Sequence, residues 1–72
     1  MKIKVVLERQ GKEIKVDVKE GSSVKDLLEE VNKKEKVNPT EVIFVKDDRV
    51  VTESEELEEG DEIKFLSVIS GG

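Results

Sequence analysis

The chain has 72 residues, of which 43% are charged, and its formal net charge is −5 at pH 7. This length allows one small domain with a modest core. Because the sequence contains no cysteine and no histidine, it excludes a disulfide framework, a thiol nucleophile, a catalytic triad and a zinc site of the usual ligands.

Two strands are predicted at the start of the chain. Residues 2–8 alternate between apolar and mostly charged side chains, and residues 13–19 do the same. A period of two indicates a strand with one buried face. Since the link at residues 9–12 is short and contains glycine, the pattern predicts a hairpin. The inward faces carry Ile3, Val5, Leu7, Ile14, Val16 and Val18.

A helix is predicted next. Ser23 and Asp26 fit a capping box, in which Ser23 caps the first amides and Asp26 lies in the positive first turn. Apolar residues follow at i, i+3, i+4 and i+7, which is the spacing of one buried helix face. The pair Asn38-Pro39 is expected to end the helix. The buried face consists of Val24, Leu27, Leu28 and Val31.

The second half of the chain predicts three more strands, at residues 41–46, 49–52 and 62–68. Asp47-Asp48 forms the turn between the first two, and Glu59-Gly60-Asp61 is a turn signal before the third. Alternation along the last strand directs two apolar side chains, Ile63 and Phe65, inward. For residues 41–46 the inward pair stays open between Val42 with Phe44 and Ile43 with Val45.

Charge is distributed unevenly along the chain. Residues 1–40 carry 10 basic and 8 acidic side chains, whereas residues 41–72 carry 3 basic and 10 acidic ones. The acidic half disfavours nucleic acid as a partner, because phosphates repel it. It suits a partner with a basic docking surface, or it serves only to solvate the surface. Most of this charge lies in one run: Glu53, Glu55, Glu56, Glu58, Glu59, Asp61 and Glu62.

No metal or phosphate site is predicted. The acidic residues lack the spacing of a calcium loop, and the glycines at positions 11, 21 and 60 are isolated, so no Gly-rich loop can cradle a phosphate. No apolar run approaches the length of a signal-peptide core or a membrane span. We therefore expect a cytoplasmic protein with no membrane partner, no bound cofactor and no catalytic residues of its own.

The predicted order, β-β-α-β-β-β, is an α+β layout of two layers, with a mixed sheet of about four to five strands on one helix. This order fits the β-grasp, in which the first and last strands pair in parallel at the centre of the sheet. We expect a single domain over residues 1–68, monomeric when free, and a flexible tail over residues 69–72. The tail then leaves from a rigid central strand, which fixes its direction.

The sequence ends in Gly71-Gly72. Two glycines make a poor end to a fold, because they have no side chains to bury and the largest backbone entropy. They present a carboxylate well, since a Gly-Gly tail can thread a channel too narrow for any other dipeptide. The alternative is a frayed tail that happens to end in glycine.

These features together resemble the small sulfur carriers of the ThiS/MoaD type, within the ubiquitin-like β-grasp superfamily. Leu57-Glu-Glu-Gly60-Asp61-Glu-Ile63 is similar to the family's Leu-x-x-Gly-Asp-x-hydrophobic element, and Val68-Ile-Ser-Gly71-Gly72 is similar to its terminus. With the strand order, the resemblance spans the whole chain. Three departures leave the pathway open. Phe65-Leu66-Ser67 stands where MoaD-type proteins often have prolines, Asp47-Asp48 replaces an asparagine-glycine turn often seen in ThiS, and the Ser-Gly-Gly ending is similar to archaeal ubiquitin-like modifiers.

The resemblance implies a carrier and not an enzyme. An E1-like adenylating enzyme of the ThiF/MoeB type, using ATP and magnesium, would activate the Gly72 carboxylate, while Gly71 and Ser70 thread its active site. A sulfur donor would convert Gly72 to a thiocarboxylate, which a downstream synthase uses in thiamin, molybdopterin or transfer RNA thiolation. The alternatives are a modifier joined through Gly72 to lysines of a target protein, and a β-grasp interaction module whose tail never reacts.

A partner-docking patch is predicted from strand parity. Val6, Leu66 and Val68 point away from the helix and lie near the tail, with Lys4 and Lys64 around them. Neighbouring exposed apolar residues often mark an interface. The alternative is that isolated exposed valines are normal in strands.

Overall fold

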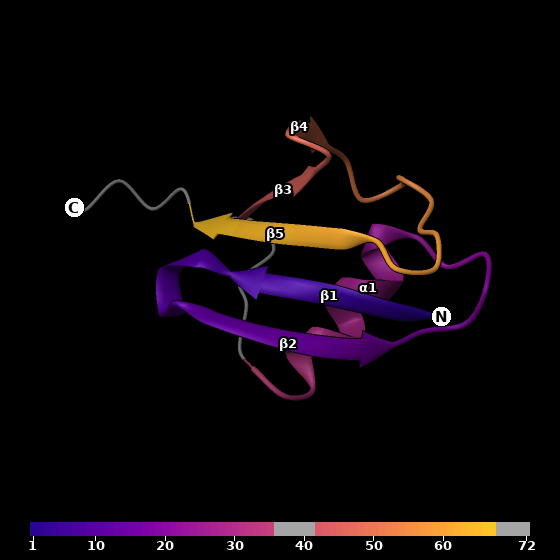
Figure 1. The fold of residues 1–72 in the computed structure, drawn as a ribbon, viewed down its shortest axis with the longest axis horizontal. Coiled ribbons are helices and arrows are strands. Elements are labelled where there is room, and N and C mark those ends of the chain that lie inside the picture. The colour runs from indigo at the N-terminus through magenta and orange to yellow at the C-terminus, as the bar shows by residue number, and fades with distance from the viewer. Residues whose placement is uncertain (36–41, 68–72) are drawn as a thin grey trace.

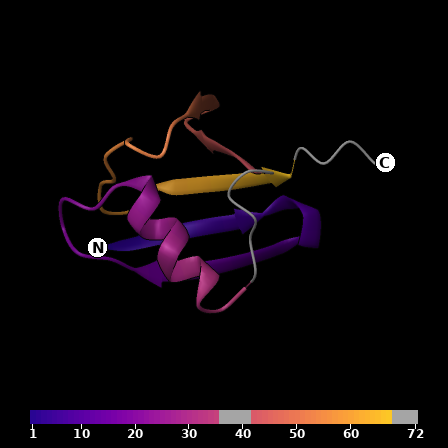
Figure 2. The ribbon, with the colours of Figure 1, turned by 180° about the vertical axis from the view of Figure 1, so that it is seen from behind.

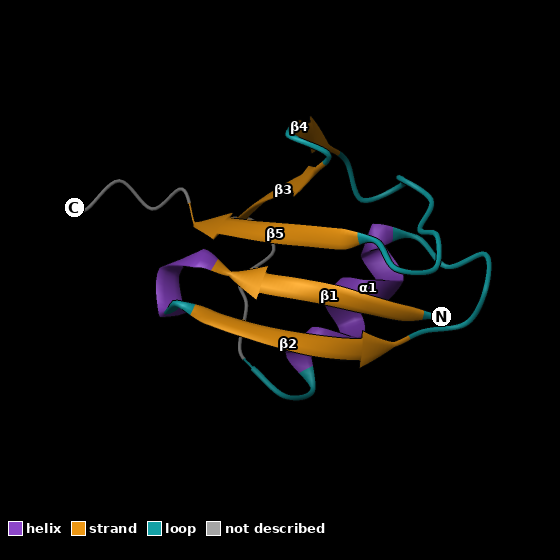
Figure 3. Cartoon of the chain, viewed as in Figure 1, coloured by secondary structure: helices purple, strands orange, loops and turns teal. Residues whose placement is uncertain are grey.

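A computed structural model describes residues 1–35 and 42–67. Within them the chain forms a five-stranded sheet with one α-helix packed on it (Figures 1 and 3). The elements are β1 (Lys2–Leu7), the 3-10 helix η1 (Glu8–Gln10), β2 (Lys12–Asp17), α1 (Val24–Asn32), β3 (Val42–Lys46), β4 (Arg49–Val51) and β5 (Glu62–Ser67).

The strand order across the sheet is β2-β1-β5-β3-β4. β1 and β5, the first and last strands of the chain, pair in parallel at its centre, and the other three pairings are antiparallel. The helix α1 crosses one face of the sheet, as the view from behind shows (Figure 2). The predicted α+β layout, the hairpin and the parallel central pair of a β-grasp are confirmed.

The core lies between α1 and the inner face of the sheet. The predicted helix face is fully buried, and β1 and β5 contribute the inward residues that alternation assigns to them. The open question about β3 is resolved in favour of Val42 and Phe44, since the Phe44 ring packs edge-on against Phe65 at 5.1 Å. The buried apolar residues are Ile3, Val5, Leu7, Val16, Val24, Leu27, Leu28, Val31, Phe44, Leu57, Ile63 and Phe65.

The helix begins as predicted but ends earlier. The backbone N–H of Ser23 donates a 2.9 Å hydrogen bond to the Asp26 carboxylate, which is one half of a capping box. The last helical residue is Asn32, and the expected stop at residues 38 and 39 lies outside the described residues. The apolar stripe explains the difference, because after Val31 no side chain in the next turn can be buried against the sheet.

A buried lysine joins β3 to the acidic run. Lys46 faces the core side of the sheet and is only 7% exposed. Its Nζ lies 3.2 Å from the Asp61 carboxylate and 3.5 Å from that of Glu55, and it donates a 3.1 Å hydrogen bond to the Glu56 carbonyl. Burial alone would lower the pKa of Lys46, but the two carboxylates outweigh burial and hold the pKa above its ordinary value.

Carboxylates of the acidic run also bind backbone groups. Asp61 accepts a 2.7 Å hydrogen bond from the Glu58 N–H, and Glu59 accepts one of 3.2 Å from the N–H of Lys2 in β1. The acidic run therefore shapes the turn before β5, in addition to any role in solvation or steering.

Replacing Lys46 with methionine removes the cation that faces Asp61 and Glu55 and leaves the Glu56 carbonyl without the Lys46 donor. We expect Lys46→Met to lower the free energy of unfolding by about 1–3 kcal/mol, measured by denaturant titration. Lys15→Met, at an exposed lysine, is the matched control and should change it by less than about 0.5 kcal/mol.

The stabilisation that Lys46 provides has a defined pH dependence. Because the folded-state pKa of Lys46 is raised, its stabilisation is complete below the ordinary value of 10.5 and is lost as the pH rises through the folded pKa. The difference between wild type and Lys46→Met should be constant from neutral pH up to that value and then shrink. Equal stability of the two proteins at neutral pH would contradict this assignment.

The turn between β3 and β4 is strained. Asp47 and Asp48 have φ values of 53° and 63°, in the left-handed region that a two-residue hairpin turn of this type requires. A residue with a side chain is disfavoured there by about 1–2 kcal/mol, less for aspartate than for most. Asp48→Gly should therefore raise the free energy of unfolding by about 0.5–1 kcal/mol, whereas Ser54→Gly, at a turn residue without positive φ, should lower it. A destabilised Asp48→Gly protein would show that the aspartate side chain, and not backbone strain, governs this turn.

Candidate docking face and C-terminal tail

The face of the sheet opposite α1 carries an apolar surface at its centre. Residues that alternate with the buried ones on β1, β5 and β3 point to this side and are partly exposed. The strand register places Leu66 beside Ile43 and Val45 beside Val50. We call the following set the outer apolar patch: Val6, Ile43, Val45, Val50 and Leu66.

Two of the predicted docking residues lie in this patch. Val6 on β1 pairs with Lys64 on β5, so Leu66 is the next residue of β5 on the same face. Val6 and Leu66 therefore lie on one side of the sheet within one rung of each other. The third predicted member, Val68, lies outside the described residues, as do Ser70, Gly71 and Gly72.

Sequence reasoning missed the β3 and β4 part of the patch. The sequence does not show whether Ile43 and Val45 face inward or outward, because both faces of β3 are apolar. Alternation cannot distinguish the two faces of such a strand. Val50, on the edge strand β4, is 71% exposed, the one large apolar side chain among the described residues that is mainly in solvent. The sequence does contain a signal for the patch, namely the consecutive apolar residues 42–45. A strand with one buried face needs an apolar residue only at every second position.

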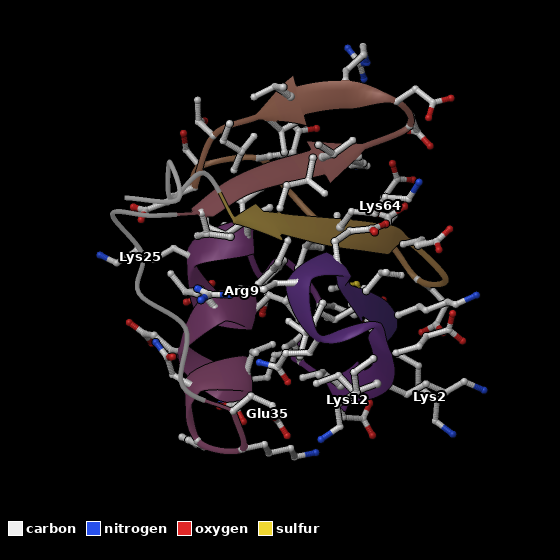
Figure 4. All side chains as sticks on the ribbon, turned by 90° about the vertical axis from the view of Figure 1, so that its left-hand side faces the viewer. Lys2, Arg9, Lys12, Lys25, Glu35 and Lys64 are labelled. Carbon is white, nitrogen blue, oxygen red and sulfur yellow. The ribbon has the colours of Figure 1, made fainter. Side chains whose placement is uncertain are left out.

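The two lysines predicted around the patch differ in their partners. The Nζ of Lys4 lies 3.3 Å from the Glu13 carboxylate and 3.8 Å from that of Glu62. Lys64 lies on the central strand, away from α1 (Figure 4), and makes no ion pair or hydrogen bond through its side chain with any described residue. The patch thus borders one lysine that is paired with carboxylates and one that has no such partner among the described residues.

The two ends of β5 lie at opposite ends of the sheet. Its start adjoins the acidic run, and its last residue, Ser67, lies at the end where β1 leads into η1 (Figure 1). Near that end the Lys12 ammonium lies 2.6 Å from the Glu35 carboxylate and ties β2 to the segment after α1 (Figure 4). Five residues follow Ser67, and a fully extended chain of that length reaches at most about 18 Å.

Comparison with known proteins identifies the family. The model of the ThiS family matches residues 5–72, so this chain belongs to the ThiS family. The match continues through the terminal glycines.

The crystal structure of SAMP1 from Haloferax volcanii is similar in fold. The TM-score is 0.80, the sequence identity is 16%, and all of each chain is covered. At this identity the likeness shows the fold alone, a ubiquitin-like β-grasp. A comparison with curated protein sequences gives no match. Among the described residues, none of the helices has the length and apolar character to cross a membrane.

Truncating a side chain on the inner face of β5 should destabilise the protein much more than truncating one on its outer face. Phe65 is 3% exposed in the core, so Phe65→Ala should lower the free energy of unfolding by about 3–5 kcal/mol. Leu66 lies on the outer face, and Leu66→Ser should cost about 1 kcal/mol or less. Thermal and denaturant unfolding measure both. A loss at Leu66 as large as that at Phe65 would mean that the outer face is covered within the folded protein.

Proposed function

We propose that this chain is a sulfur carrier whose Gly72 carboxylate is activated by an adenylating enzyme of the ThiF/MoeB type. The observation that carries the proposal is the match to the ThiS family, which extends to Gly72. The fold supports it, because β5 is paired on both sides and holds the base of the tail in a fixed position. We propose that the protein acts in the cytoplasm.

The chemistry explains why a partner enzyme is required. A carboxylate is a poor electrophile, since its charge is delocalised and its leaving group would be oxide. Attack of a carboxylate oxygen on the α-phosphorus of ATP expels pyrophosphate and gives an acyl-adenylate, whose leaving group is AMP. A persulfide of the sulfur donor then attacks the acyl carbon, AMP departs, and reduction of the resulting acyl disulfide by a thiol leaves the thiocarboxylate.

The chain's own contribution to these steps is positioning. It contains no cysteine or histidine, so the groups that bind ATP and magnesium and move protons belong to the partner. Gly71 and Ser70 offer a thin tail that can enter a narrow active site. The outer apolar patch, including Val6 and Leu66, provides a surface on which the enzyme can hold the carrier beside that entrance.

The thiocarboxylate is a better nucleophile than the carboxylate and can transfer its sulfur to a small-molecule precursor or to a transfer RNA base. If a lysine amine attacks the acyl-adenylate first, the product is an isopeptide between Gly72 and a target protein. Both reactions use the same activated carbonyl, so the nucleophile present decides between carrier and modifier.

The proposal is tested by intact mass spectrometry. The chain is incubated with a ThiF/MoeB-type enzyme from the same source, ATP, magnesium and a sulfur donor. We expect a mass gain equal to the replacement of one oxygen by sulfur, localised to Gly72. A chain lacking Gly72 is the control and should show no gain, because its terminal carboxylate stops one residue short.

Two other results would contradict the sulfur-carrier proposal. No mass gain and no ATP–pyrophosphate exchange, with an enzyme active on another carrier, would indicate an interaction module that does not react. Activation without thiocarboxylate, together with Gly72–lysine conjugates in the source cell, would indicate a protein modifier.

A further inference from the structure

One cation lies within the outer apolar patch. Lys64 is the middle outward residue of β5 and is partly buried. The register places Val6 of β1 on one side of it and Val45 of β3 on the other, and Leu66 follows it on the same face. The Lys64 side chain therefore leaves the sheet between aliphatic neighbours on three sides.

No carboxylate of the described chain neutralises Lys64. The nearest acidic residue on the same face of β5 is Glu62, and its carboxylate is directed to Lys4, as is that of Glu13. Lys46, the buried lysine on the inner face, has two carboxylates and a carbonyl as partners. Lys64 differs from both, although it lies on the central strand and not at an edge of the sheet.

Covering the patch changes the energetics of this ammonium group. In the free protein it can reach water while its alkyl stem covers the neighbouring valines. A partner surface that covers those valines removes part of this water, and an ammonium group without an acceptor in an apolar interface carries a large desolvation cost. A partner that presents a carboxylate at this point avoids the cost and gains a charge-assisted contact.

We propose that Lys64 binds a carboxylate of the partner enzyme, set within an apolar surface that covers the outer apolar patch. The proposal rests on the proposed function, since the partner is the adenylating enzyme that receives the tail. The contact fixes the register of β5 on the enzyme and so directs the tail. Gly72 is the eighth residue after Lys64, so the Cα atoms of the two residues lie within about 29 Å of each other.

Lys64→Met tests the proposal by the sign of its effect. Methionine keeps an unbranched apolar stem and removes the charge, so a purely apolar partner surface would bind it as well as or better than wild type. A partner carboxylate would instead be left buried and unpaired, and we expect the Kd for the adenylating enzyme to rise by about tenfold or more. Calorimetric titration of the enzyme with the full-length carrier measures the Kd.

Lys15→Met is the matched control. Lys15 projects from the same face, on the edge strand β2, and is exposed and without an ion pair to any described residue. Lys15→Met makes the same change in charge outside the patch, and its Kd for the enzyme should stay within about threefold of the wild-type value. Thermal unfolding of both variants checks that each is folded.

The kinetics of carrier activation provide a second measure of docking. In ATP–pyrophosphate exchange, Lys64→Met should raise the KM for the carrier, because the contact that docks the carrier is lost, whereas Lys15→Met should keep the KM within about threefold of wild type. Added salt should weaken the binding of wild type to the enzyme more than the binding of Lys64→Met, since only wild type has the ion pair that salt can screen.

Failure of the Lys64 proposal can be distinguished from failure of the proposed function. If wild type is activated normally and Lys64→Met binds with an equal or lower Kd, the partner carboxylate is wrong and the proposed function stands. If wild type neither binds the enzyme nor supports exchange, the proposed function is contradicted and the assignment of Lys64 with it.

Discussion

The parallel pairing of β1 with β5 is the constraint on which the rest of the structure depends. It brings the first and last strands of the chain together at the centre of the sheet, where Val5 and Ile63 are fully buried beside each other. A central strand cannot shift without breaking hydrogen bonds on both sides, so the position of Ser67 is fixed by the sheet. A tail that begins there has a defined origin, and the outer residues of the same strand, Lys64 and Leu66, lie in line with it.

This arrangement divides the molecule into two functional ends. At the start of β5, the acidic run packs Leu57 into the core and supplies the carboxylates that hold Lys46. At the other end, β5 leads into the tail beside an apolar, partly cationic face. The sequence shows the acidic charge as a feature of the surface, but the structure gives part of it a role in folding. The docking face that we propose therefore depends on Lys64 and its aliphatic neighbours, and not on the acidic run.

Local patterns made most of the fold predictable. Alternation predicts β1, β2 and β5, the stripe ending at Val31 predicts the helix face, and Glu59-Gly60-Asp61 predicts the turn, in which Gly60 has a φ of 86°. Features that depend on distant residues were missed. A lysine at the end of an apolar strand is ordinarily exposed, and Lys46 is buried only because Asp61, distant in sequence, lies beside it. The inward face of β3 was equally hidden, because Phe44 is selected by its contact with Phe65.

Methyl NMR of the carrier with its adenylating enzyme tests the central claim most directly, namely that one rigid strand both docks on the partner and delivers the tail. With the valine, isoleucine and leucine methyl groups labelled, we predict that binding shifts the signals of Val6, Ile43, Val45 and Leu66, and leaves those of Val24, Leu28 and Leu57 near their free positions. Shifts centred on the helix or on the acidic run, with the outer apolar patch unchanged, would contradict the account.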